Sequence, residues 1–75
     1  MIRRKQLYTI LRLVAQEMQG KYRYNDFLNA FIKYLIEHKM VDPKIKDLQY
    51  FDTDYDYLYE AASSFWENIL KKRTH

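Results

Sequence analysis

The chain contains no cysteine, one glycine and one proline in 75 residues. Without cysteine it can form neither disulfides nor thiolate zinc sites, which support many very small domains. Glycine and proline mark turns, so their scarcity argues against a multi-stranded sheet. No apolar run approaches the roughly 20 residues that a membrane-spanning helix needs. These absences predict a helical protein with no membrane span, and the lack of cysteine is typical of a cytoplasmic protein.

Apolar side chains are abundant in spite of the small size. Hydrophobic residues make up 48% of the chain and aromatic residues 17%, against 31% charged residues. This balance is typical of a folded protein rather than a disordered one. A chain of this length buries only about 60% of its unfolded surface, so large aromatic side chains are needed to build a core.

Three segments have the apolar spacing of helices, at about residues 4–19, 25–39 and 54–72. The apolar stripe of the first comprises Leu7, Ile10, Leu11, Val14 and Met18. Gly20 follows it, and glycine commonly ends a helix in the left-handed conformation. The second segment is apolar over about 200° of its circumference, so it is expected to be the central helix, between two partners.

The third segment has a narrower apolar arc of about 140°, which includes both Ile69 and Leu70. Before it, Asp42 followed by Pro43 is a helix-start signal that predicts one helical turn at about 43–48. The fold class expected is all-α, as a three-helix bundle with a short additional helical turn between the second and third long helices. The whole chain forms a single domain.

The segment Phe51–Glu60, "FDTDYDYLYE", resembles a calcium loop at first sight. Its alternating carboxylates are Asp52, Asp54 and Asp56. A calcium EF-hand loop also needs glycine at position six and glutamate at position twelve, where this chain has Tyr57 and Ser63. The better explanation is a helix start, because carboxylates in a first turn interact favourably with the helix dipole. The sequence predicts no metal site.

Charge is distributed unevenly along the chain, whose net charge is +3. Residues 1–46 hold ten Lys and Arg against four Asp and Glu, whereas residues 47–75 hold three against six. On the last helix, three carboxylates share one exposed strip with an aromatic ring nearby. These four residues form the predicted protein-binding surface: Asp56, Tyr57, Glu60 and Glu67. Such a surface suits a basic partner protein and repels phosphate.

The basic part of the chain supports an alternative, a nucleic-acid-binding regulator. Cations and tyrosines alternate on the first helix and in the connection Lys21–Tyr24, and they could neutralise phosphates and stack on unpaired bases. The residues predicted for this contact are Arg3, Arg4, Lys5, Arg12, Lys21 and Arg23. The acidic last helix counts against this alternative, which therefore ranks second.

No catalytic constellation is present in the sequence. Ser63 and Ser64 fall in the middle of a helix without a base, and the two histidines have no metal-ligand spacing. His38 is expected to be partly exposed near the free carbonyls of a helix end. The protein is therefore expected to be no enzyme, to need no cofactor and to have no small-molecule substrate.

The function expected is that of a small helical binding module, a regulator, inhibitor or accessory subunit that docks on a partner protein. Homodimerisation is a further hypothesis. It follows from the small core and from Tyr8 and Leu13, which fall outside the apolar stripe of the first helix.

Overall fold

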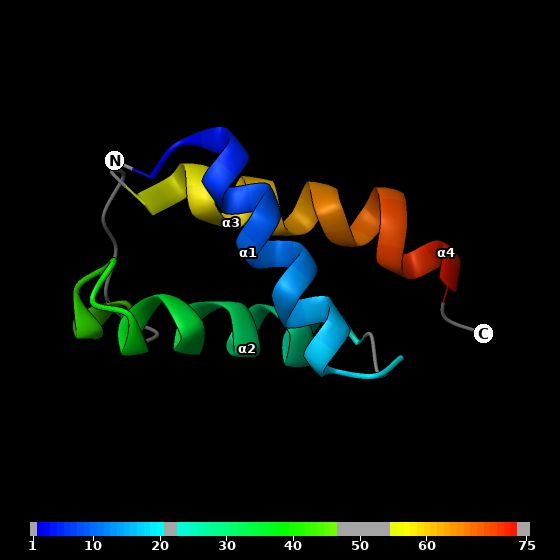
Figure 1. The fold of residues 1–75 in the computed structure, drawn as a ribbon, viewed down its shortest axis with the longest axis horizontal. Coiled ribbons are helices and arrows are strands. Elements are labelled where there is room, and N and C mark those ends of the chain that lie inside the picture. The colour runs from blue at the N-terminus through cyan, green and yellow to red at the C-terminus, as the bar shows by residue number, and fades with distance from the viewer. Residues whose placement is uncertain (1, 21–22, 47–54, 74–75) are drawn as a thin grey trace.

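A computed structural model describes residues 2–20, 23–46 and 55–73, which form a bundle of three long helices (Figure 1). In chain order the elements are α1 (Arg4–Glu17), α2 (Tyr24–Glu37), the 3₁₀ turn η1 (Pro43–Lys46), α3 (Asp56–Phe65), the π-helical turn η3 (Trp66–Leu70) and α4 (Lys71–Arg73). The described part of the chain contains no strand. The prediction of an all-α three-helix bundle with a short additional turn is confirmed.

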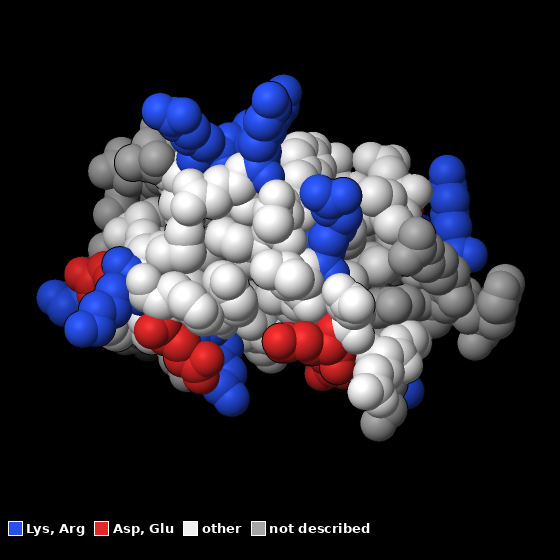
Figure 2. All heavy atoms as spheres, viewed as in Figure 1, with Lys and Arg blue, Asp and Glu red and all other residues white. Residues whose placement is uncertain are grey.

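The core lies where α1, α2 and α3 meet, and each of these helices contacts the other two. α2 therefore has two partners as expected, but α1 and α3 also touch each other, so the arrangement is a three-way bundle. The largest fully buried side chains are Leu11, Phe27, Phe31, Leu35, Leu58 and Leu70. Every buried side chain among the described residues is apolar. The charged side chains stand at the surface, as Figure 2 shows for one face.

The apolar stripe of α1 packs as the spacing predicts, but the helix ends two residues before its predicted end. Four of its five apolar residues are buried, and Met18 is half-buried. The helix ends at Glu17 rather than at residue 19, because Gln19 already has a positive φ of 55° and Gly20 follows with 89°. The residues outside the stripe, Tyr8 and Leu13, are both exposed.

α2 begins at Tyr24, one residue before the predicted start, and ends in a Schellman motif. The amide of Met40 donates to the carbonyl of Leu35 at 2.9 Å, and the amide of Lys39 donates to the carbonyl of Ile36 at 3.0 Å. This motif requires a left-handed residue, and Lys39 occupies that position with φ 57°. A side chain with a Cβ is disfavoured there.

Replacing Lys39 by glycine is therefore expected to stabilise the protein by about 0.5–1 kcal/mol. Urea or thermal unfolding followed by circular dichroism measures the change. Lys39→Ala is the matched control, since alanine removes the charge but keeps the Cβ. Equal gains in both variants would mean that the lysine charge, rather than the backbone, limits stability at this position.

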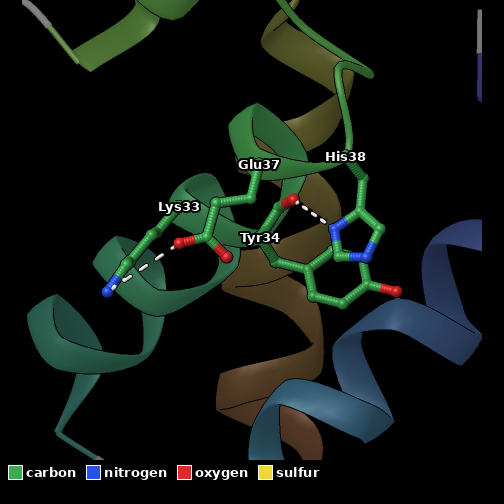
Figure 3. A network of polar contacts seen from close by, with 4 residues as sticks. All are labelled: Lys33, Tyr34, Glu37 and His38. Carbon is green, nitrogen blue, oxygen red and sulfur yellow. Dashed lines mark hydrogen bonds and ion pairs between the residues drawn. The ribbon is translucent and has the colours of Figure 1, made fainter.

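His38 lies at the end of α2 (Figure 3), exposed as expected. Its Nδ1 is 2.9 Å from the carbonyl oxygen of Tyr34, and its ring stacks on the Tyr34 ring at 3.9 Å. Because a carbonyl only accepts, Nδ1 carries the proton. The same carbonyl also accepts the His38 amide at 3.1 Å, so it is not one of the free carbonyls of the helix end. The neighbouring Lys33 and Glu37 form an exposed ion pair at 3.9 Å.

The third long helix differs from the sequence-based expectation at its end. A regular α-helix would place Ile69, four residues after Phe65, on the buried face. The π-helical turn Trp66–Leu70 inserts one extra residue, and Leu70 takes the buried position instead. Leu70 is 0% exposed and Ile69 is 36% exposed. The prediction that both belong to the apolar arc is correct for Leu70 and wrong for Ile69.

The short turn after α2 begins as the Asp42–Pro43 signal predicts. Asp42 Oδ1 accepts the amide of Lys44 at 2.9 Å, and the Asp42 carbonyl accepts the amide of Ile45 at 3.0 Å. The side chain of Ile45 is buried against the bundle. The predicted residues 47 and 48 of this turn lie outside the described residues, as do Asp52 and Asp54 of the segment that resembles a calcium loop.

Candidate functional site

A groove of about 460 Å³ lies between the N-terminal half of α1 and α3. The N-terminal segment and α1 contribute Ile2, Arg4, Leu7 and Tyr8, and α3 contributes Tyr57, Glu60, Ala61 and Ser64. Apolar and aromatic side chains form most of this lining. The cation of Arg4 on α1 and the carboxylate of Glu60 on α3 complete it, together with the hydroxyl of Ser64. The groove therefore offers an apolar floor between two oppositely charged walls.

Helical spacing brings the lining residues of each wall together. Arg4 and Tyr8 are four residues apart on α1, and Glu60 and Ser64 are four apart on α3, so each pair shares one helix face. Leu7 belongs to the core, at 3% exposed, and forms part of the groove's apolar lining. Both walls thus stand on packed helices, which hold a binding surface more rigidly than loops do.

Two contacts join the walls of the groove. The Ile2 amide donates to the Tyr57 hydroxyl at 3.2 Å and ties the segment before α1 to α3. The Tyr8 ring leans on the ring of Phe65, with centroids 6.5 Å apart. Tyr57 is half-buried, so it projects less than the sequence suggested. Tyr8 remains 37% exposed at the α1 wall.

The charges on the two walls do not neutralise each other. Ion pairs within 4.0 Å join Lys33 to Glu37 and Lys71 to Glu67, and none joins Arg4 to Glu60 in the described part of the chain. Both groove charges are exposed to solvent. An occupant that carries a carboxylate near Arg4 and a cation near Glu60 would match both walls.

The structure divides the predicted protein-binding residues into two groups. Tyr57 and Glu60 line the groove, whereas Asp56 is exposed in the first turn of α3 and outside it. Glu67 lies on η3, where the Lys71 Nζ is 3.5 Å from its carboxylate. Arg4 was predicted to contact nucleic acid, but it lies in the same groove as Tyr57 and Glu60, which were predicted to bind a protein.

The remaining predicted cations lie outside the groove. Arg3, Lys5, Arg12 and Arg23 are exposed, and Lys21 lies outside the described residues. Figure 2 shows Lys and Arg side chains projecting separately from a broad uncharged surface. α1 has no acidic residue in its first turn, although cations are unfavourable at the positive end of a helix dipole. The start of α1 therefore carries the exposed cations Arg3, Arg4 and Lys5 without a carboxylate in its first turn.

The other lining residues were not singled out by the sequence. Ala61 and Ser64 have small side chains that leave space beside α3, but small residues in mid-helix are common and predict nothing alone. The position of Tyr8 outside the apolar stripe was the one signal available. It indicated exposure, and it did not indicate which helix the ring faces.

A separate aromatic cluster joins the start of α2 to the end of α3. The Tyr24 hydroxyl and Ser63 Oγ are 2.7 Å apart, and the Tyr24 ring meets Trp66 edge to face at 5.5 Å. Burial, the Asp56 carboxylate and Tyr24 raise the pKa of Tyr59 above its ordinary value, so its hydroxyl stays protonated at neutral pH. These contacts stabilise the bundle and lie outside the groove.

Residues 2–20, 23–46 and 55–73 contain no group of three or more His, Cys, Asp or Glu placed to hold a metal ion. None of the helices in these ranges has both the length and the apolar character needed to cross a bilayer. The hydroxyl of Ser64, which lines the groove, accepts a hydrogen bond from the Asn68 side chain at 3.2 Å.

Comparison with known proteins leaves the groove as the main guide to function. No protein-family model matches the chain. No curated protein and no solved structure is significantly similar to it.

Proposed function

We propose that this protein is a small, cytoplasmic, non-enzymatic binding module that docks on a partner protein through the groove between α1 and α3. It would act as a regulator, inhibitor or accessory subunit. The observation that carries the proposal is the groove itself, with an apolar floor between an arginine and a glutamate that do not pair with each other. Apolar grooves between helices commonly accept an amphipathic helix of another protein.

The chemistry of the groove defines the occupant. Its floor, which includes Leu7, Tyr8 and Ala61, suits one or two apolar side chains from a single face of the partner helix. A carboxylate on one flank of that helix would meet Arg4, and a cation on the other flank would meet Glu60. The buried apolar contact supplies most of the affinity, and the two exposed charges select the orientation of the helix and speed its association.

Site-specific photo-cross-linking in the native host tests this proposal. A benzophenone amino acid in place of Tyr8 is expected to capture one partner protein, and the same group in place of Lys33 on α2 is expected not to. Ser64→Arg fills the groove from an exposed position and should reduce capture at least tenfold. Thr9→Arg, an exposed α1 position outside the lining, is the matched control and should leave capture unchanged. Equal capture in both arginine variants would contradict docking in the groove.

Nucleic-acid binding is the second candidate. The observation that favours it is the group of exposed cations around the start of α1, Arg3, Arg4 and Lys5, which form no ion pair within the described residues. One of the groove's own features counts against it, because the Glu60 carboxylate would repel phosphate. Contact with nucleic acid would therefore use the exposed cations outside the groove, such as Arg3, Arg12 and Arg23.

A further inference from the structure

The charges of the groove are complementary to those of a second copy of the same groove. Its α1 wall carries Arg4 and its α3 wall carries Glu60. A second copy of the same groove, turned by 180°, presents a glutamate where the first has an arginine and an arginine where the first has a glutamate. In such an isologous contact, any favourable pair occurs twice.

We infer that a second copy of this chain occupies the groove and forms a two-fold symmetric dimer, with Arg4 of each protomer facing Glu60 of the other. The regulatory role of this dimer rests on the proposed function, because the dimer covers the same groove on which a partner protein would dock. The exposed Tyr8 ring supplies the apolar side chain that each copy places over the floor of the other. The two floors then cover each other.

Charges beside the groove support this occupant. Arg3 and Lys5 flank the α1 wall, and Asp56 lies one turn before Glu60 on the α3 wall. In the two-fold arrangement the basic edge of each protomer approaches the acidic edge of the other. The charges of Arg3, Arg4, Lys5, Asp56 and Glu60 sum to +1 for each protomer, so repulsion at the contact is smaller than the net charge of +3 on each chain would suggest. A small core also gains from apolar surface that a partner covers.

The dimer would control access to the docking site. A partner helix and a second copy compete for one groove, so the fraction of free grooves falls as the concentration of this protein rises. Below the dissociation constant the monomer offers an open groove. Above it, the partner has to displace a protomer before it binds, and the protein inhibits its own docking.

Sedimentation equilibrium of the purified chain, from about 1 to 500 μM, tests the dimer. We expect a dissociation constant on the order of tens of micromolar. Arg4→Glu replaces two attractions by two repulsions, as does Glu60→Arg, and each is expected to weaken the dimer about tenfold or more. The double variant Arg4→Glu/Glu60→Arg restores both opposite-charge pairs and should return the constant to within about threefold of the original. The matched control exchanges the exposed α2 pair, as Lys33→Glu/Glu37→Lys, and should change nothing.

The outcomes are distinct. A monomeric mass over the whole range overturns the dimer, and so does a dimer that both single variants leave intact or that the double variant does not restore. Circular dichroism shows whether each variant keeps its helices. Because the measurement contains no partner protein, it is independent of the cross-linking experiment. A monomer that still cross-links through Tyr8 to another protein would overturn the dimer and keep the proposed function, and a dimer whose Tyr8 cross-links only to a second copy of this chain would do the reverse.

Discussion

Replacing Leu70 by alanine is expected to destabilise the protein by about 2–5 kcal/mol, whereas Ile69→Ala, one residue earlier, should cost less than about 1 kcal/mol. The two side chains have similar volumes, and a regular α-helix would bury Ile69. The π-helical turn reverses their positions. Leu70 is completely buried, and its loss leaves a cavity, while Ile69 is exposed over about a third of its surface.

Thermal unfolding followed by circular dichroism measures both variants. For a domain of 60–100 residues, 1 kcal/mol corresponds to about 4–8 °C in Tm, so Leu70→Ala should lower Tm by about 10 °C or more. Total stability in so small a chain is limited, and this variant is expected to be partly unfolded at 37 °C. Destabilisation by Ile69→Ala as large as that by Leu70→Ala would show that Ile69 is buried in solution, as the α register requires.

A deletion separates the two registers without removing any core side chain. Deleting Asn68 moves Leu70 from five to four residues after Phe65, which is the α-helical spacing. The variant should fold with Leu70 still buried, since π turns commonly consist of one residue inserted into an α-helix. Deleting Thr9 from the middle of α1 is the control. It rotates the following apolar residues by about 100° and should abolish cooperative unfolding.

The helices were predictable because their apolar residues follow the helical period over more than two turns. The π turn was not, because Phe65, Ile69 and Leu70 fit one arc in either register, and only packing into the core, where Leu70 is buried, chooses between them. The end of α2 was also not predictable from the sequence. Lysine gives no signal for a left-handed position, whereas Gly20 does, and Lys39 adopts it because the Schellman hydrogen bonds hold the chain there.

The sequence predicted which residues of the candidate site are exposed, but not that they lie together in one groove. Charged side chains remain in solvent, so the exposure of Arg4 and Glu60 follows from their chemistry and their helical spacing. Their common groove depends on how α1 crosses α3, which single-chain periodicity does not determine. The sequence therefore assigned Arg4 to one surface and Tyr57 and Glu60 to another. Tertiary packing places all three on the same one.

The cations outside the groove provide the test between the two candidate functions. The chain should bind mixed-sequence DNA and RNA only weakly, without sequence preference and with strong dependence on salt, because paired phosphates release counterions. If Arg3, Arg12 and Arg23 each neutralise one phosphate of duplex DNA, together they contribute about 2.7 to the log–log salt slope, or roughly 40-fold in affinity between 50 and 200 mM salt. The variant in which all three become alanine should lose that part of the slope.

Docking on a partner protein should be insensitive to the three arginine substitutions and sensitive to a change in the groove. The triple arginine variant leaves every lining residue of the groove in place, so partner capture should stay within about threefold of the original. Ser64→Arg should abolish partner capture, yet its added cation should leave DNA binding unchanged or slightly stronger. Fluorescence anisotropy with labelled duplexes at several salt concentrations, beside the cross-linking assay, measures both responses. Tight binding of one nucleic-acid sequence at physiological salt, lost in the triple variant and kept in Ser64→Arg, would make nucleic-acid recognition the main function and docking on a protein secondary.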